Sequence, residues 1–299
     1  MIIGSDRDEV IENIKRAAES GNFFAKVETH DPVLTTEESN AIINKYLKER
    51  GTASFRMRSC AARGIANVLT DVLCRDTEIV GIEKAQTVSG GAIITSNHFS
   101  PVENTGIRLL ARRLGRKRIN IVSQETNLAM PGIIGFLMNY ADIIPISGNI
   151  HYTQREFADI LKELLTDDEF VLIYPEEEMW FNYRKPRPPK LGAFYYAARL
   201  GFPVISCFIE QRDLPEQDTA EFRKVKFIVH VLDVLYHDPS KSVWENSALM
   251  SAADYRLKKE IYEKVYSKPL DYTFDPSDIA GWTGTLEKSG AEAGTEDPA

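Results

Sequence analysis

Residues 90–104 have the sequence GGAIITSNHFSPVEN, in which a short apolar run leads into a polar turn and then into a helix start. Two glycines precede the run, and Asn97 and His98 follow it, as is typical of a short buried strand. In open α/β sheets, ligands bind at the carboxyl ends of the strands. This stretch therefore predicts a strand that delivers Asn97 and His98 to the functional edge of a sheet.

The rest of the chain extends this pattern. From residue 76 onward, apolar runs alternate with helical segments, which predicts an α/β fold with a mostly parallel central sheet flanked by helices. Strands are expected at residues 78–82, 92–96, 119–122, 143–146, 170–174, 204–209 and 227–234. Helices are expected at residues 101–114, 131–140, 153–165, 192–199 and 252–266.

The two ends of the chain differ from this central part. Residues 1–53 are expected to form an N-terminal extension of short helices, because apolar residues recur there at helical spacing. The main domain is expected at residues 54–270 and opens with an amphipathic helix at 54–75. Residues 271–299 are expected to form a partly disordered tail, since the sequence from about residue 284 is small and polar.

The composition limits the classes of function. The 299 residues are 43% hydrophobic and 27% charged, which is typical of a folded, enzyme-sized protein. The net charge of −8 argues against a nucleic-acid partner. The three cysteines are not spaced as in metal sites or redox motifs and give no disulfide framework, which predicts a reducing compartment. No secretory signal or membrane-spanning run is apparent in the sequence. We therefore expect a cytoplasmic protein that meets lipid, if at all, from outside the bilayer.

His98 and Glu103 are the candidate catalytic residues. A histidine can act as a general base at neutral pH, and a carboxylate five residues later can orient it and stabilise its protonated form. Glu103 also has a structural interpretation, because residues 100–103 form an S-x-x-E capping box with proline at the first helical position. The residues by themselves leave both interpretations open.

A second candidate segment is EFVLIYPEEEMWFNYRKPRPPK at residues 169–190, an apolar strand that opens into a charged loop. Its glutamates are suited to contact hydroxyl groups or a metal, and its basic residues are suited to hold a phosphate. Charge runs in loops are also commonly just solvated. The residues in question are Glu176, Glu177, Glu178, Arg184, Lys185, Arg187 and Lys190.

Two basic clusters suggest contact with an anionic membrane surface. Arg56, Arg58 and Arg63 lie near the start of the 54–75 helix, and residues 108–118, RLLARRLGRKR, contain six basic residues. This is more positive charge than a helix C-terminus requires, and such clusters attract anionic headgroups. Solvated arginines on a core-packed helix, or contact with a partner protein, are the alternatives.

Four segments in order resemble the motif series of the glycerol-phosphate and lysophospholipid acyltransferase family, which includes the 1-acylglycerol-3-phosphate acyltransferases. They are NHFSPVEN (97–104), ADIIPIS (141–147), FVLIYPEE (170–177) and KLGAFYYAARLGFPVISCF (190–208), within a resemblance that spans about residues 76–235. The resemblance implies transfer of a fatty acyl group from acyl-CoA or an acyl carrier protein to a hydroxyl of a lysophospholipid, glycerol phosphate or sugar/glycolipid acceptor. It implies no cofactor and no metal.

The resemblance also assigns roles to residues. His98 corresponds to the family's catalytic base, Glu103 to its acidic partner, and Glu176 to the glutamate of the Pro-Glu-Gly turn that helps to bind the acceptor. Pro203 corresponds to the proline of the last motif. Asn97 and Glu177 are expected to add contacts to the substrate.

The sequence departs from the family pattern at four places. Glu103 replaces Asp, Tyr174 replaces Phe, and Glu177 stands where the family has Gly. The arginine expected after the second motif is absent from PISGN at residues 145–149. The base and its partner survive, so we expect the chemistry to be kept. Loss of the arginine argues against glycerol phosphate as the acceptor unless Arg184, Lys185 or Arg187 replaces it, and a sugar or another hydroxyl lipid is the alternative acceptor.

Two other functions stay open from the sequence. One is a non-catalytic binding protein that retains the fold and uses the acidic turn for interaction. The other is a metal-dependent hydrolase with His98, Glu103 and the three consecutive glutamates as ligands. His98 is the only histidine in the two segments that carry these ligands, residues 90–104 and 169–190, which is few for a transition-metal site.

Overall fold

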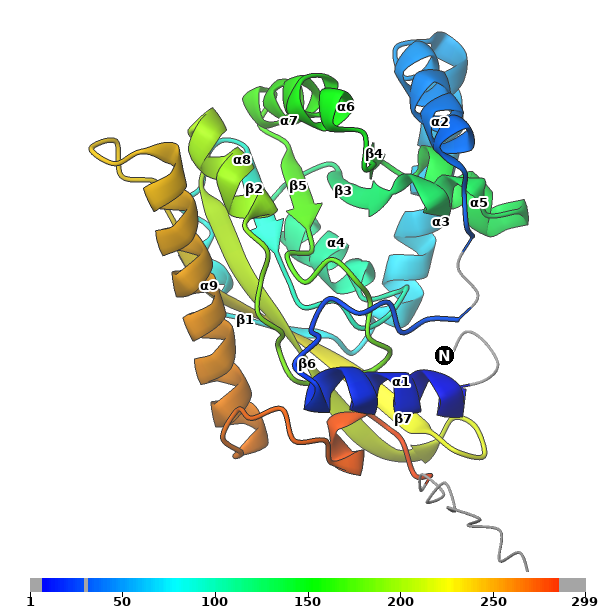
Figure 1. Ribbon diagram of the computed structural model, residues 1–299, viewed down its shortest axis with the longest axis vertical. Helices are drawn as coiled ribbons and strands as arrows, with labels where there is room; N and C mark the ends of the chain where they lie inside the picture. The colour runs from blue at the N-terminus through cyan, green and yellow to red at the C-terminus, as the bar shows by residue number, and fades with distance from the viewer. Residues whose placement is uncertain (1–6, 30–31, 285–299) are drawn as a thin grey trace, which may run out of the picture.

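The computed structural model describes residues 7–29 and 32–284 and is built on a seven-stranded sheet of order β1-β7-β6-β2-β5-β3-β4 (Figure 1). Strands β6, β2, β5, β3 and β4 are mutually parallel, whereas β7 is antiparallel to β6 and pairs in parallel with β1. The strands are β1 (Glu78–Val80), β2 (Ala92–Thr95), β3 (Ile119–Gln124), β4 (Ile143–Ile146), β5 (Phe170–Ile173), β6 (Val204–Gln217) and β7 (Arg223–Leu235). The predicted fold class is confirmed.

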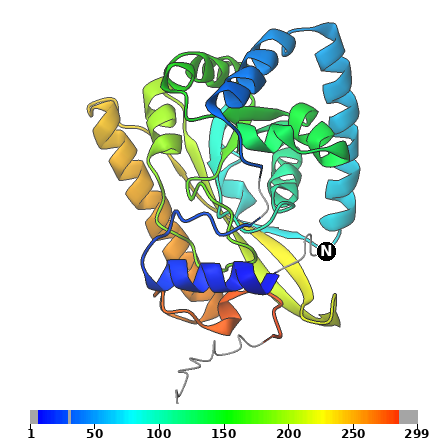
Figure 2. The same ribbon diagram turned by 45° about the vertical axis from the view of Figure 1, so that its right-hand side comes forward.

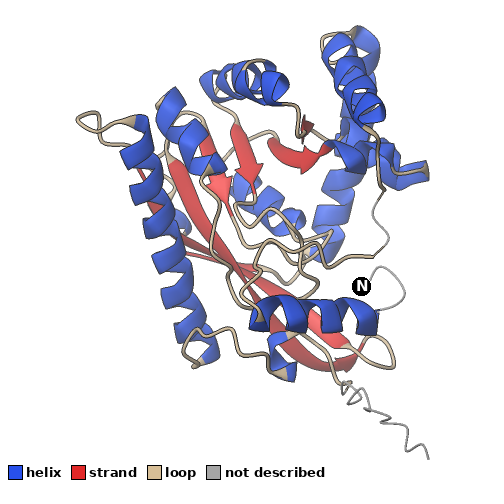
Figure 3. Ribbon diagram, viewed as in Figure 1, coloured by secondary structure: helices blue, strands red, loops and turns tan. Residues whose placement is uncertain are grey.

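Helices cover both faces of this sheet (Figure 3). Within β2, Ile94 joins the core cluster under α4 (Asn104–Arg113), while Ile93 joins the cluster under α7 (Glu156–Thr166) and α8 (Gly192–Leu200). A strand that buries both faces needs a continuous apolar run rather than an alternating one. This is why residues 92–94, AII, form a continuous apolar run, while the buried Thr95 that follows donates to Asp254.

The remaining helices include three that follow one another at the N-terminal side, α1 (Arg7–Glu19), α2 (Thr36–Glu49) and α3 (Ala53–Leu73). In Figure 2, α3 stands as one long helix at the right-hand edge of the molecule. It packs against α4 and against α5 (Gly132–Tyr140). Short helical segments complete the chain: η1 (Ile82–Lys84), η2 (Glu125–Ala129), α6 (Ile150–Gln154) and η3 (Pro276–Asp278).

Three sequence predictions needed correction. The helix expected at 153–165 is two helices, α6 and α7, separated at Arg155. The helix expected at 252–266 is α9 (Val243–Tyr266), which begins nine residues earlier because Ser242 and Glu245 form a capping box. Strands β6 and β7 extend beyond the expected bounds as a two-stranded ribbon, since they continue to pair with each other as far as Gln217 and Arg223.

The ends of the described chain meet over the loop that follows β5. On the α1 side, Val10, Ile11 and Ile14 pack in one cluster with Trp180, Phe181, Tyr183, Phe222 and Ile279. Residues 275–282, expected in the tail, pair with the body of the protein through the bridges Tyr183↔Ile279 and Phe222↔Trp282. The expected disorder falls on residues 285–299, which lie outside the described residues. The boundaries at 53 and 270 stay predictions.

Candidate active site

The turn after β2 and the loop after β5 lie side by side, because β2 and β5 are neighbours in the sheet. The backbone amide of His98 donates to Glu176 Oε2 at 3.4 Å. The amides of Trp180 and Asn182 donate to the carbonyls of His98 (3.1 Å) and Phe99 (2.8 Å). The structure thus brings together the two segments that the sequence singled out.

His98 and Glu103 form the central contact of this site. His98 Nδ1 lies 2.5 Å from Glu103 Oε1, while the second carboxylate oxygen accepts a hydrogen bond from the Ser100 amide. Glu103 is 1% exposed, whereas the His98 side chain is 21% exposed. A carboxylate at Nδ1 favours the tautomer with its proton on that nitrogen. Nε2 is then the atom able to accept a proton.

The same glutamate also contributes to the entry of the helix. α4 begins at Asn104, and residues 101–103 form a turn before it. Half of the predicted capping box is present, since Glu103 reaches back to the Ser100 amide. The reciprocal half is not, because the Ser100 hydroxyl accepts from the amide of Val102 at 3.4 Å. One carboxylate therefore supports the turn with one oxygen and the imidazole with the other.

Tyr174 is a further member of the site that the sequence showed only as a departure from the family's Phe. Its ring stacks on the His98 imidazole, with a centroid distance of 4.0 Å and an interplanar angle of 10°. Burial, and then the neighbouring Glu103 carboxylate, hold the pKa of Tyr174 well above its ordinary value. Its hydroxyl is buried near Glu103, and no acceptor among the described residues lies within ordinary hydrogen-bond length of it.

Asn97 lies within the sheet rather than on its surface. Its side chain donates to the Ile209 carbonyl at 3.1 Å and accepts from the Ile209 amide at 2.8 Å. The buried amide thereby continues the pairing of β2 with β6 beyond the end of β2. This contact fixes the direction in which the chain leaves β2 just before His98. Contact of Asn97 with substrate stays a prediction.

Glu176 and Arg187 form a buried ion pair. Arg187 Nε and Nη2 each lie 3.1 Å from Glu176 Oε2, and the Arg187 amide donates to Oε1 at 3.1 Å. The guanidinium also donates to the carbonyls of Phe23 and Glu178 and lies over the Trp180 ring. Burial lowers the pKa of Arg187 below its ordinary value. The pair ties the loop after β5 to the segment that follows α1.

The other predicted binding residues of this loop are dispersed. Lys185 lies 2.7 Å from Asp278 and donates to the Thr273 carbonyl, so it holds the C-terminal segment. Arg184 pairs with Asp213 of β6 and donates to the Ser277 carbonyl. Glu177 is exposed, has a positive φ of 61° and lies 3.8 Å from Lys190. Substrate contact by these residues stays a prediction.

The 108–118 cluster is largely used within the protein. Arg108 is buried and donates to the Ala141 carbonyl, Arg112 pairs with Asp71, and Arg118 pairs with Glu169. Arg116 donates to the carbonyls of residues 88–90 and 168. Within residues 7–29 and 32–284, Arg113 and Lys117 are the members of the cluster whose side chains form no ion pair and no hydrogen bond to another protein group.

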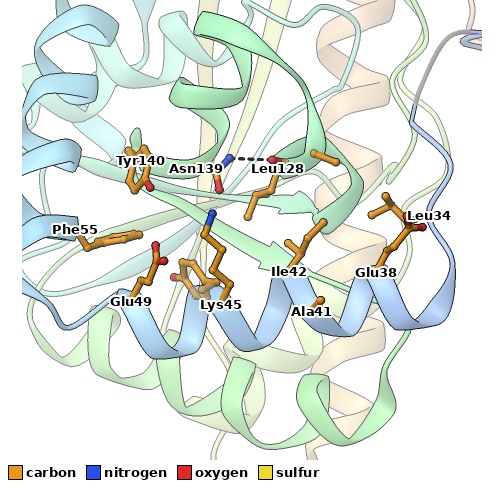
Figure 4. Close-up of a pocket in the computed structure, with 12 residues that line it drawn as sticks. Leu34, Glu38, Ala41, Ile42, Lys45, Glu49, Phe55, Leu128, Asn139 and Tyr140 are labelled. Carbon is orange, nitrogen blue, oxygen red and sulfur yellow. Dashed lines mark hydrogen bonds between the residues drawn. The ribbon is translucent and has the colours of Figure 1, made fainter.

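A pocket of about 390 Å³ lies between α2 and the segment from η2 to α5 (Figure 4). Its walls are mostly apolar, and Lys45 extends into it from α2. None of the predicted site residues lines it. The lining residues are Leu34, Glu38, Ala41, Ile42, Lys45, Tyr46, Glu49, Phe55, Leu128, Ala129, Asn139 and Tyr140.

Two further properties concern the described residues as a whole. In that part of the chain, no group of three or more His, Cys, Asp or Glu side chains is placed to hold a metal ion. None of its helices combines the length and the apolar character needed to cross a bilayer.

Comparison with known proteins gives a family match and structural matches. Residues 76–210 match the family described as Acyltransferase. Solved structures that resemble the chain include the crystal structure of the 1-acyl-sn-glycerophosphate acyltransferase PlsC from Thermotoga maritima, at a TM-score of 0.49 and 14% identity, covering 88% of this chain and 97% of that one. No curated protein matches the sequence.

Proposed function

We propose, from the premise that this chain belongs to the acyltransferase family through its residues 76–210, that it moves a fatty acyl group from a thioester to a hydroxyl acceptor. The donor is acyl-CoA or an acyl carrier protein. The acceptor is a lysophospholipid, glycerol phosphate or a sugar/glycolipid. The observation that carries the proposal is the contact of the part-exposed His98 imidazole with the buried Glu103 carboxylate.

The reaction follows from that contact. His98 Nε2 removes the proton of the acceptor hydroxyl while the oxygen attacks the thioester carbonyl carbon. The tetrahedral intermediate then collapses, the carbon–sulfur bond breaks, and the proton on the imidazole passes to the departing thiolate. Glu103 fixes the tautomer and stabilises the transient imidazolium, as the acid does in a hydrolase triad. No covalent enzyme intermediate is needed, because the thioester is already activated.

The acceptor-binding part of the proposal rests on the loop after β5. Glu176 lies against the His98 backbone, so this loop forms the wall beside the base. Arg184, Lys185 and Arg187 are nevertheless engaged with carboxylates and carbonyls of the protein. A phosphate on the acceptor would compete with those contacts, and a sugar or other neutral hydroxyl acceptor would not. A panel of both kinds is therefore the informative assay.

The test is incubation with acyl-CoA or acyl carrier protein and this panel, followed by release of free thiol and by isolation of the acylated product. Acyl transfer requires both in equal amounts, and the His98→Ala variant should give neither. Thiol release without acylated acceptor would favour a hydrolase. If metal removal abolished that release and added zinc or magnesium restored it, the metal-dependent alternative would be preferred. No thiol release with any pair would favour a binding protein.

We further propose that α3 lies on an anionic membrane surface, as a peripheral contact on the cytoplasmic side. Four of its exposed apolar residues, Met57, Ile65, Val68 and Val72, recur at helical spacing and therefore lie along one side of the helix. The adjacent helix α5 exposes Ile133 and Ile134. Of the three arginines predicted to contact lipid, Arg63 pairs with Asp142 and Arg58 donates to the Tyr140 hydroxyl, while Arg56 is exposed next to Met57. An amphipathic helix with an exposed apolar stripe and a basic residue beside it is suited to the headgroup region.

Sedimentation with anionic and with neutral vesicles tests this proposal. We expect binding to anionic vesicles at low salt and release at higher salt, since the Debye length is about 8 Å at 0.15 M. The double variant Val68→Asp, Val72→Asp should weaken binding, whereas Leu249→Asp, at a similarly exposed apolar residue of α9, should not. Equal partitioning of all variants would refute the role of α3.

A further inference from the structure

We propose that Tyr174 is a positioning residue for the His98–Glu103 pair, with its ring fixing the plane of the imidazole and its hydroxyl acting as a third donor to the Glu103 carboxylate. This inference rests on the acyl transfer proposed above. It concerns a residue that the motif series gives only as a departure, Tyr where the family has Phe, and to which it assigns no role.

Stacking of the Tyr174 ring on His98 restricts rotation of the imidazole about its bond to Cβ, and this rotation sets where Nε2 points. The imidazole and phenol planes are nearly parallel, at 10° and a centroid distance of 4.0 Å. Rotation of the imidazole about its bond to Cβ would break both this stacking and the 2.5 Å contact of Nδ1 with Glu103. When His98 takes a proton, the π face of Tyr174 also stabilises the positive charge. Stacking therefore favours the protonated state through which the reaction passes.

The hydroxyl contact follows from matching donors with acceptors. A carboxylate has about four acceptor positions. His98 Nδ1 and the Ser100 amide occupy two of them on Glu103, which is almost fully buried. Burial raises the pKa of Tyr174 and the nearby Glu103 carboxylate raises it further, but no acceptor among the described residues lies within hydrogen-bond length of the buried Tyr174 hydroxyl. A buried donor without a partner is stabilised when it meets a buried carboxylate that still has acceptor positions to fill.

The electrostatics of Tyr174 agree with a donor role. Burial and the charge of Glu103 hold the pKa of Tyr174 well above its ordinary value, so the phenol keeps its proton. Glu176 faces the His98 backbone from the β5 side, and the buried Arg108 approaches Tyr174 from α4. A hydrogen bond from the phenol stabilises ionised Glu103 and so opposes transfer of the imidazole proton to it. The Nδ1 proton therefore stays on the imidazole, and the proton that Nε2 took from the acceptor hydroxyl is the one that passes to the departing thiolate.

Two departures from the family pattern thus meet in space. Glu103 replaces Asp and Tyr174 replaces Phe, and the two residues are 71 positions apart (174 − 103) in the sequence. The glutamate has one methylene more than Asp, and the tyrosine has one hydroxyl more than Phe. We infer that the hydroxyl steadies the longer and more flexible carboxylate.

A double-mutant cycle with Glu103→Asp and Tyr174→Phe tests the hydroxyl. Tyr174→Phe keeps the stacked ring and should lower kcat roughly 10-fold, with KM little changed. In the Glu103→Asp background, the same substitution should lower kcat much less, because the effects of substitutions at two contacting residues are not additive. An equal loss in both backgrounds, or parent-like kcat in Tyr174→Phe, would overturn the contact with Glu103.

Tyr174→Met tests the ring, since methionine fills a similar volume without an aromatic face. We expect kcat to fall roughly 3- to 30-fold further than in Tyr174→Phe. The ¹⁵N shifts of the His98 ring, assigned by their absence from His98→Ala, should show one tautomer in the parent and in Tyr174→Phe and a mixture in Tyr174→Met. A single tautomer in all three would overturn the positioning role. The spectra can be recorded without a substrate. If the parent protein proved inactive, that result would contradict the proposed acyl transfer but not the positioning of His98 by Tyr174.

Discussion

The turn after β2 and the loop after β5 start from adjacent strands, and both carry charged residues into the same site. They use these charges differently. In the turn, His98 keeps a part-exposed side chain whose Nε2 is free to accept a proton. In the loop, Glu176 pairs with Arg187 and Lys185 pairs with Asp278, with all four side chains at most 4% exposed. The short turn holds the reactive group, and the long loop uses most of its charges to hold itself in place.

The contrast shows that a charge run does not by itself indicate a binding surface. Each charge of a buried ion pair needs the opposite charge of its partner, because a buried charge without a partner is strongly destabilising. Residues in such pairs are therefore not readily available to bind a substrate. The turn needs few residues because Asn97 and Ser100 fix its backbone through the hydrogen bonds described above. Variants in the two regions should therefore fail in different ways.

The largest effect is expected in the turn. His98→Ala should lower acyl transfer by a factor on the order of 10⁴, because the general base is lost. The melting temperature should stay close to that of the parent, since the side chain contributes more to chemistry than to packing. Rates on the most active acceptor, measured beside circular dichroism melting, check both statements. Parent-like turnover would remove His98 from the mechanism.

Glu103 sharpens the comparison, because one side chain has both a structural and a chemical role. Glu103→Gln keeps an acceptor for the Ser100 amide and should change stability little. It should lower the rate roughly 10²–10⁴-fold, because the amide cannot stabilise the imidazolium and favours the wrong tautomer. Glu103→Asp should retain measurable activity. If Glu103→Gln both melts and turns over like the parent, Glu103 is a helix-entry residue only.

In the loop, the effect should be on stability first. Arg187→Met leaves Glu176 buried without its cation, which should lower the free energy of unfolding by about 3–5 kcal/mol. Adding Glu176→Gln should recover part of this loss, because the uncompensated charge is removed. Urea denaturation of the two variants measures both steps. A stable Arg187→Met protein with a raised KM for a phosphorylated acceptor would instead support acceptor binding by this arginine.

The smallest effect is expected at Glu177, whose left-handed backbone stands where the family has Gly. Glycine tolerates positive φ, but it also makes the unfolded chain more flexible. The exposed contact with Lys190 contributes little. Glu177→Gly should therefore leave the free energy of unfolding unchanged or raise it by up to about 1 kcal/mol, as urea titration can show. A loss of activity without a loss of stability would assign Glu177 to the substrate site.

Much of the fold could be predicted from local sequence. β2 and β4 were expected within one residue of their observed bounds, because buried strands read as short apolar runs between turn residues. The ribbon at residues 210–217 could not, since EQRDLPEQ is polar and contains a proline. Its pairing with β7 depends on the partner strand rather than on its own apolar pattern.

The candidate site was predicted in part. Local order along the chain identified His98 and Glu103, whose contact the structure shows directly. The stacking of Tyr174 was missed, because nothing in FVLIYPEE indicates which ring faces a histidine 76 positions earlier (174 − 98). The pairing of Arg112 with Asp71 was missed for the same reason. Partners distant in sequence are set by the tertiary fold.

The loop after β5 is completed by residues that are made very early and very late. Trp180 bonds to Ala25 across 155 positions, and Arg187 bonds to Phe23 across 164. The loop also needs Asp278 and Ile279, which are synthesised about 90 residues after it. During translation, the first half of the sheet can form while this wall of the site is still open. A nascent chain would therefore contain His98 and Glu103 long before the site is complete. The site could become catalytically competent only after Asp278 and Ile279 have been synthesised.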